Sequence, residues 1–189
     1  AGGASWTGTA STHNVAVGNY AMGQGAMNGV SGSTAVGYQA LTNVTTGNGA
    51  VAVGYYAASA LTTGIGNTAV GYQALMTEDT GPYSTAIGYQ ALKIQNNANG
   101  KNTAVGYLSQ TSTAAGQQNT SVGQLSMQYI GGSSANNNVA IGYRSMMSSG
   151  TITDNVAANN VAVGPDSLLT ITTGQRNVAI GSSAGDSIT

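Results

Sequence analysis

The 189-residue chain lacks cysteine and phenylalanine, and it holds only two prolines, one tryptophan and nine charged residues. Without cysteine, neither disulfide bonds nor thiolate metal sites can form. No apolar run approaches the roughly 18 residues that a membrane-spanning helix needs. The four lysines and arginines are too few to form the basic patch that a nucleic acid requires. These absences argue against a disulfide scaffold, a membrane span and a nucleic-acid partner.

The low charge bears on solubility and assembly. The formal net charge is −1, and a net charge near zero promotes association. We therefore expect a surface coated in Asn, Gln, Ser and Thr, or an assembly of several copies. Hydrophobic residues make up 41% of the chain, and their regular placement argues against disorder. The chain begins at Ala1 rather than Met and carries no signal-like segment, which leads us to expect a processed product of export or virion assembly.

What the chain does contain is one array of repeats, centred on a glycine that recurs every 17 to 22 residues. The repeat glycines are Gly18, Gly37, Gly54, Gly71, Gly88, Gly106, Gly123, Gly142, Gly164 and Gly181. A unit this short cannot bury a core alone and must stack on its neighbours. We expect a single repeat domain over residues 14–185, an N-terminal segment or cap at 1–13 and a C-terminal tail at 186–189.

The three residues before each repeat glycine predict a short β-strand. Val or Ile stands directly before the glycine in every copy: Val17, Val36, Val53, Val70, Ile87, Val105, Val122, Ile141, Val163 and Ile180. Ala stands two residues before the glycine in nine copies and Ser121 in the other, while Val or Thr stands three before it in all ten. Alternating β-branched and small residues are typical of a strand. We expect the Val/Ile face to form the inward core, and the Ala face to pack closely against another surface.

The residues after each repeat glycine predict a second strand with two side-chain ladders. Tyr follows the glycine directly in six copies: Tyr38, Tyr55, Tyr72, Tyr89, Tyr107 and Tyr143. Ala or Ser stands three residues after the glycine in all ten copies, and Leu or Met stands four after it in seven. Stacking at a strand spacing of about 4.8 Å would produce a Tyr ladder, an aliphatic ladder and a second crowded surface.

Two further columns complete the predicted coil. Asn stands four residues before the repeat glycine in seven copies, and stacked Asn side chains can hydrogen-bond along a solenoid axis. A second glycine, seven residues before the first in five copies, predicts the returning turn, while the repeat glycine marks a bend. Gly, Asn and β-branched residues are too frequent for helices. The sequence predicts an all-β fold, a parallel β-solenoid of about ten coils of about 17 residues, each with two short strands and two turns.

Several repeats resemble those of known fibrous proteins. Asn-Val-Ala-Ile-Gly, at Asn138–Gly142 and Asn177–Gly181, resembles the repeats of YadA-like heads of trimeric autotransporter adhesins. Asn-Thr-Ala-Val-Gly-Tyr-Gln-Ala-Leu at Asn67–Leu75, with near copies at Ser33–Leu41 and Ser84–Leu92, resembles bacteriophage tail-fibre repeats. This resemblance covers nearly the whole chain. It implies a left-handed parallel β-roll, three chains side by side in a trimer, and an extracellular or virion location. The chain departs from an adhesin in showing no coiled-coil stalk or membrane anchor, and from many tail fibres in showing no C-terminal self-cleaving chaperone domain.

Signatures of catalysis and of ligand binding are sparse. His13, the only histidine, is expected at a solvated or cap position rather than in a catalytic triad. The adjacent Glu78 and Asp79 lie in a turn insertion, and we expect them to face solvent. Calcium at this pair is the disfavoured alternative, because no repeat column is acidic. Residues 23–25, Gly-Gln-Gly, are interpreted as a flexible turn. We therefore expect no catalytic residue, no cofactor and no metal.

The leading hypothesis is a non-enzymatic structural protein that forms part of an extracellular or viral fibre. Its partner would be itself, either in a homotrimeric shaft or in a head-to-tail filament in which Trp6 plugs the neighbouring subunit. The alternative is an adhesin or receptor-binding module that recognises a glycan or a host surface through the insertions Met127–Asn137 and Met147–Asn159.

Three further interpretations have weaker support in the sequence. The Tyr ladder is a candidate glycan surface, although a purely structural stack explains it more simply. Ice binding by the Thr column is disfavoured, because Val replaces Thr in five of the ten copies. Asn43 and Asn119 begin glycosylation acceptor sequences, which arise readily by chance in a chain rich in Asn and Thr.

Overall fold

Each coil of the solenoid contains one three-residue strand, at the position before the repeat glycine that the sequence predicts. The computed structural model describes residues 10–112, 116–148 and 155–188. The strands are β1 (Val15–Val17), β2 (Thr34–Val36), β3 (Val51–Val53), β4 (Thr68–Val70), β5 (Thr85–Ile87), β6 (Thr103–Val105), β7 (Thr120–Val122), β8 (Val139–Ile141), β9 (Val161–Val163) and β10 (Val178–Ile180). The described residues contain no helix, and hence none that could cross a membrane.

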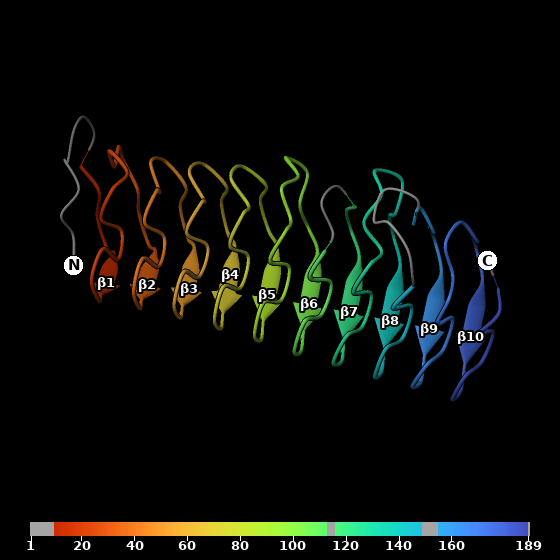
Figure 1. Ribbon diagram of the computed structural model, residues 1–189. Helices are drawn as coiled ribbons and strands as arrows, with labels where there is room; N and C mark the ends of the chain where they lie inside the picture. Colours follow the sequence, from red (N-terminus) through yellow and green to blue (C-terminus); the bar gives the residue numbers. More distant parts are fainter. Residues whose placement is uncertain (1–9, 113–115, 149–154, 189) are drawn as a thin grey trace.

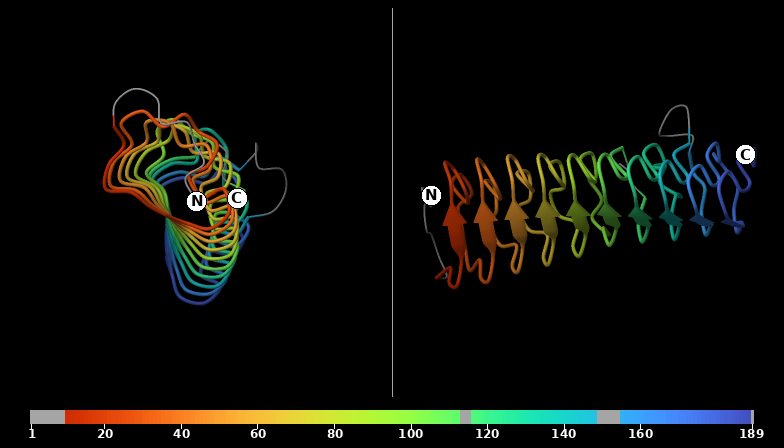
Figure 2. Two further views of the ribbon diagram at one scale, coloured as in Figure 1. Left: turned by 90° about the vertical axis from the view of Figure 1, so that its left-hand side faces the viewer. Right: turned by 90° about the horizontal axis from the view of Figure 1, so that it is seen from below.

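The ten strands form one parallel sheet in the order β1 to β10. They lie side by side in chain order from one end of the molecule to the other (Figure 1). The register is uniform, so that Ala69 of β4 lies opposite Ala52 of β3 and Ala86 of β5. Seen from the end, the coils lie one behind another, each turned slightly relative to the one before (Figure 2). These features confirm the predicted parallel β-solenoid.

The small residues of the strands face the interior, which reverses the predicted orientation of the two strand faces. In every strand from β2 to β10 the middle residue is buried, while the residues on either side are half-buried or exposed. Ile87, for example, is 39% exposed, whereas Ala86 is fully buried. The prediction that the Val/Ile face forms the inward core is therefore wrong.

Small residues line the interior because two walls of the coil approach each other closely. The Ala or Ser three residues after the repeat glycine is buried from the first coil to the ninth, and this column faces the middle residues of the strands. One wall is the segment that follows the repeat glycine, and the other is the strand. The hydroxyl oxygens of Ser109, in the first wall, and Ser121, in the second, are 2.6 Å apart. At native packing density, larger side chains do not fit between walls this close.

Larger apolar side chains fill the remainder of the interior. The Leu and Met residues four positions after the repeat glycine are fully buried, which confirms the aliphatic ladder: Met22, Leu41, Leu75, Leu92, Met127, Met146 and Leu168. A second inward column begins with Met27, Val44 and Leu61 and includes Ile130 and Ile171 further along the chain. Burial of these side chains supplies the hydrophobic stabilisation that no coil could obtain alone.

The segment after each repeat glycine is not a strand, so the prediction of two strands per coil is wrong. Its second and fourth residues adopt a left-handed backbone: φ is 54° at Gln73 and 51° at Leu75. This conformation directs backbone hydrogen bonds alternately to the two neighbouring coils. The N–H of Gln73 donates to Tyr55 O at 2.8 Å, and the N–H of Leu75 donates to Ala91 O at 3.0 Å. These hydrogen bonds offset the energetic cost of a left-handed backbone conformation, which residues other than glycine seldom adopt.

The repeat glycine forms the predicted bend, and its lack of a side chain is required for two reasons. At Gly106 φ is +134°, a conformation strained for any residue with a Cβ atom. A Cβ atom there would also come within 2.5 Å of the carbonyl oxygen of Gly123 in the next coil. Close coil-to-coil packing thus keeps glycine at this position in every coil that is followed by another, while at Gly181, in the last coil, only the positive φ of +127° applies.

The Asn column forms the predicted hydrogen-bonded ladder inside the solenoid. Asn119 Oδ1 accepts a hydrogen bond from the backbone N–H of Asn138 at 2.9 Å, and Asn119 Nδ2 donates to Ala135 O at 2.8 Å. The same arrangement recurs at Asn102, Asn138 and Asn160. Each Asn therefore satisfies buried backbone groups of the turn and of the following coil.

Candidate functional site

Five tyrosines from consecutive coils stack along one side of the solenoid, one ring directly after each repeat glycine. Neighbouring ring centroids are 5.1–5.3 Å apart, and the ring planes lie within 3–19° of parallel. We call this group the tyrosine ladder; it consists of Tyr38, Tyr55, Tyr72, Tyr89 and Tyr107. Its spacing is typical of offset-stacked aromatic rings. The predicted Tyr ladder is confirmed for these five coils.

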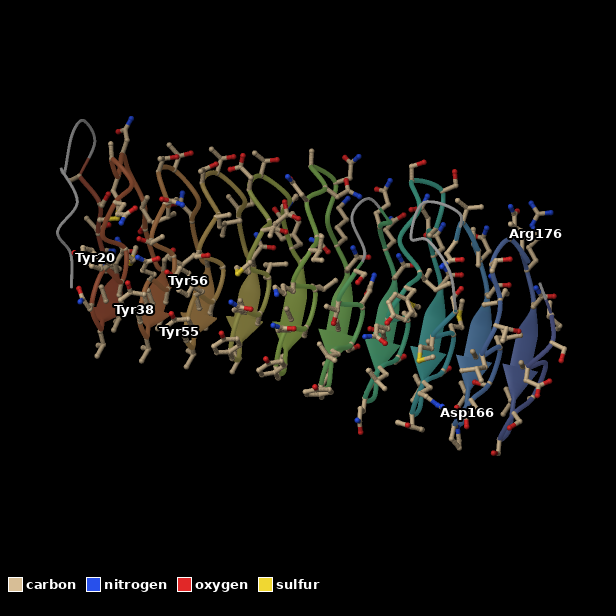
Figure 3. All side chains as sticks on the ribbon, viewed as in Figure 1. Tyr20, Tyr38, Tyr55, Tyr56, Asp166 and Arg176 are labelled. Carbon is tan, nitrogen blue, oxygen red and sulfur yellow. The ribbon has the colours of Figure 1, made fainter. Side chains whose placement is uncertain are left out.

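Two tyrosines at the second position after the glycine extend the cluster in edge-to-face contacts. The ring centroid of Tyr56 lies 4.6 Å from that of Tyr55 and 5.5 Å from that of Tyr38, and Tyr20 lies 6.3 Å from Tyr38 (Figure 3). Desolvation, followed by the neighbouring phenols of Tyr38 and Tyr55, raises the pKa of Tyr56 above its ordinary value of 10.0. Near neutral pH the phenol of Tyr56 is therefore uncharged.

Glutamine amides flank the tyrosine ladder. Gln39, Gln73 and Gln90 each follow a ladder tyrosine directly in the sequence. Gln90 Nε2 donates to Gln73 Oε1 at 2.9 Å, and Gln39 Nε2 donates to the phenol oxygen of Tyr38 at 3.3 Å. The side of the solenoid thus presents aromatic rings next to neutral groups that both donate and accept hydrogen bonds.

The stack stops where Gln124 replaces tyrosine after the repeat glycine. Tyr143, in the coil after that, contacts a charged group: the guanidinium of Arg144 lies 4.9 Å from its ring centroid. Arg144 Nε donates to Asp166 Oδ1 at 2.7 Å, the one ion pair found within the described residues. This hydrogen bond raises the pKa of Arg144. The two ends of the solenoid therefore differ, with an uncharged aromatic cluster toward one end and an ion pair toward the other.

The outer face of the sheet is an apolar surface. It carries the Val and Ile residues expected in the core, with Val17 55% exposed and Ile141 42% exposed. The other outward position of the strands holds Thr in five strands and Val in five. An outward row of Val and Ile side chains of this kind is characteristic of a protein contact or ligand-binding face.

Glu78 is fully buried, so the expectation that it faces solvent is wrong. Its Oε1 accepts the Gly81 N–H at 2.6 Å, and its Oε2 accepts Gln95 Nε2 at 2.7 Å. Gln95 in turn accepts a hydrogen bond from Asn102 Nδ2 at 2.8 Å and donates to Ser84 Oγ at 2.9 Å. Glu78 and Gln95 continue the inward column that begins with Met27, Val44 and Leu61 in the preceding coils. Hydrogen bonds from protein groups take the place of solvent around the carboxylate.

The structure does not assemble these acidic residues into a metal centre. The oxygens of Glu78 face N–H donors, which suit an anion and not a cation. The side chain of Asp79 accepts a hydrogen bond from Thr62 Oγ1. Throughout residues 10–112, 116–148 and 155–188, no group of three or more potential metal ligands occurs. His13 is exposed, with Nδ1 3.0 Å from Thr12 Oγ1.

The two longest insertions lie against each other. Asn155 Nδ2 donates to Tyr129 O at 2.8 Å, and the Gly132 N–H donates to Asn155 O at 3.1 Å. The rest of the second insertion, residues 149–154, falls outside the described residues, as does Trp6. The two glycosylation acceptor sequences differ in accessibility: Asn43 is exposed, whereas Asn119 is buried in the Asn ladder.

Sequence reasoning located the aromatic column but missed two polar features. Arg144 and Asp166 both stand two residues after a repeat glycine, so alignment of that column would have indicated their proximity. Glu78 and Gln95 fall where other coils have aliphatic residues, a signal that only a full column alignment reveals. Comparisons with protein-family models, curated proteins and solved structures gave no match.

Proposed function

We propose that the protein is a non-enzymatic structural component of an extracellular or viral fibre. The observation that carries the proposal is the uninterrupted parallel sheet, in which every strand from β1 to β10 pairs in register with its neighbours. A rod whose coils are joined in this way grows in length by repetition, which is the geometry that a fibre needs.

Hydrogen bonds run along the rod axis at several points of each coil. Between β4 and β5, the N–H of Thr68 donates to Ser84 O at 2.9 Å, and the N–H of Gly88 donates to Val70 O at 2.8 Å. The Asn67 side chain adds a bond to the Ser84 N–H at 2.8 Å. Separating two coils would break all of these bonds together, so the array resists extension as a unit.

Two modes of self-association support the fibre, and both follow from surfaces described above. The exposed apolar face of the sheet suits side-by-side association into a trimer, the arrangement implied by the resemblance to adhesin heads and tail fibres. No strand among the described residues pairs with the outer edge of β1 or of β10, and such edges suit end-to-end stacking, because an open strand edge pairs readily with another strand.

Electron microscopy combined with mass determination in solution tests the proposal. We expect rods with the mass of three chains, or long filaments that repeat at the length of one solenoid. The outer-face variant Ile141→Lys should shift the mass to that of one chain if the sheet face forms the contact, while Ile87→Val serves as a conservative control. A monomer at all concentrations tested would contradict the proposal.

The alternative function is that of an adhesin or receptor-binding module. The contact of Tyr129 and Gly132 with Asn155 favours it, because the two insertions together form a local feature that the other coils lack. Shortening residues 128–136 to the length of the other turns should abolish attachment to target cells while leaving the rod intact. Unchanged attachment would exclude this function for the insertions.

A further inference from the structure

We propose that the tyrosine ladder binds an uncharged, extended polysaccharide of the cellulose or chitin type, which lies along the solenoid axis with one sugar unit per coil. The site is distinct from the insertions, and the proposal is independent of whether the rods assemble into fibres. Its parts are the five stacked rings and the glutamine amides beside them.

Four of the ladder tyrosines expose a large part of their surface to solvent. Tyr55, Tyr72, Tyr89 and Tyr107 are 41–49% exposed although each is stacked on neighbours. A column that served only to hold coils together would gain more by turning inward, as the aliphatic ladder does. The ladder leaves a line of aromatic surface in water, and such surfaces characterise binding sites.

The geometry of the stack leaves part of each ring face open. Centroid separations of 5.1–5.3 Å between nearly parallel planes are those of offset stacking, in which each ring is displaced sideways from the next and part of its face is left uncovered. Parallel rings at this separation are not sealed face against face, which is consistent with the exposure of Tyr72 and Tyr89. Apolar C–H faces of sugar rings pack on open aromatic surface of this kind.

The period of the ladder matches a linear glycan. One ring per coil repeats at nearly the length that one pyranose unit contributes to an extended, equatorially linked chain. Successive sugars would therefore meet successive tyrosines without accumulating a mismatch from Tyr38 to Tyr107. The amides of Gln39, Gln73 and Gln90 lie beside the rings and offer both donors and acceptors to sugar hydroxyls.

The absence of charge identifies the class of polysaccharide. Residues 1–77 contain no Lys, Arg, Asp or Glu, and the coils of Tyr89 and Tyr107 contain none at the first two positions after their repeat glycines. Acidic glycans and nucleic acids require cationic partners, and basic peptides require anionic ones. A neutral polymer loses no ionic hydration when it binds to this surface.

Isothermal titration calorimetry with soluble cello-oligosaccharides and chito-oligosaccharides, from the disaccharide to the octasaccharide, tests the proposal on the purified full chain. Affinity should rise with each added sugar and level off near the pentasaccharide, since the ladder has five rings. Malto-oligosaccharides of equal length follow a curved path and should bind more weakly.

Three variants locate the site. Tyr72→Ala removes the central ring and should weaken pentasaccharide binding roughly tenfold, which corresponds to about 1.4 kcal/mol. Tyr72→Phe keeps the ring and should bind nearly as well as the unaltered protein. Tyr143→Ala is the matched control, because Tyr143 occupies the same repeat position and is 45% exposed, but it lies outside the ladder.

The outcomes separate clearly. Length-dependent binding that Tyr72→Ala weakens and Tyr143→Ala leaves unchanged supports the proposal. Failure of both oligosaccharide series to bind, equal binding of the malto-oligosaccharides, or equal effects of the two alanine variants would overturn it. If Tyr72→Ala does not fold, the length series on the unaltered protein and the Tyr72→Phe variant still decide the question. None of these results depends on the mass of the assembly, so the fibre proposal stands or fails separately.

Discussion

Ser109 and Ser121 face each other across the interior of the solenoid, with hydroxyl oxygens 2.6 Å apart. The pair belongs to two columns that hold only Ala or Ser in every coil. Their contact shows how closely the two walls of the coil approach each other, and this separation decides which substitutions the array tolerates.

We expect Ala86→Leu to destabilise the protein by about 1–3 kcal/mol or more, because overpacking a tight interior forces side chains and backbone apart. Ile87→Ala, at the neighbouring exposed position, should cost much less than a buried Ile→Ala change of about 2–5 kcal/mol. Chemical denaturation of both variants measures the two effects. The reverse ranking would mean that the Val/Ile face is the core after all.

Asn119→Ala should destabilise the protein by about 1–3 kcal/mol for each buried backbone group that it leaves without a partner. The groups concerned are the Asn138 N–H and the Ala135 carbonyl. Asn43→Ala, on an exposed turn, is the matched control and should lie within about 0.5 kcal/mol of the unaltered protein. Similar unfolding midpoints for the two variants would show that the Asn ladder contributes little.

Glu78 and Gln95 should be energetically coupled. Glu78→Leu leaves Gln95 Nε2 without one of its acceptors in the interior, and Gln95→Leu leaves Glu78 Oε2 without one of its donors. Because replacing both partners of a buried polar pair is often nearly neutral, the double variant should lose less stability than the sum of the two single variants. A double-mutant cycle by urea denaturation provides the measurement; strict additivity would show that the two side chains act independently.

Alkaline pH should destabilise the tyrosine cluster. The pKa of Tyr56 in the folded protein is raised above the value of 10.0 that an exposed tyrosine has. The stabilising effect of its neutral phenol is thus fully present below pH 10, and it is lost as the pH rises through the folded-state pKa.

Spectrophotometric titration of tyrosinate absorbance checks this prediction. The titration curve of the unaltered protein should contain the late ionisation of Tyr56, above its ordinary pKa of 10.0, and Tyr56→Phe should remove that part of the curve. Tyr83→Phe is the control, since Tyr83 lies outside the tyrosine cluster and is 57% exposed. A late part of the curve that persists in Tyr56→Phe, or that Tyr83→Phe removes equally, would contradict the assignment.

The repeat period and the position of each strand could be read from the sequence, because insertions fall between repeats and leave the glycine columns aligned. The buried face of each strand could not be predicted from the sequence. Alternation at Thr85, Ala86 and Ile87 is compatible with either orientation, and hydrophobicity alone favours the wrong one. The deciding factor is the separation of the two coil walls, which depends on contacts between residues far apart in the chain.

Local backbone conformation was equally inaccessible from residue type. Gln73 and Leu75 adopt left-handed φ values, although neither residue favours that region. Hydrogen bonds to the coils on both sides impose this conformation, so it exists only in the stacked array. The tyrosine ladder could be predicted because it requires nothing beyond a uniform register. The burial of Glu78 could not, because it depends on the position of the turn insertion relative to the inward column.

The pairing of β8 with β9 shows what this architecture permits. The two strands keep their register although the intervening segment is five residues longer than the 17-residue spacing of β3 and β4. Position in the rod is therefore set by the strand and its glycine, and not by the length of chain between them. A turn of such a protein can gain or lose residues without displacing its neighbours, so new surface loops can be grafted onto one coil at a time while the shaft remains unchanged.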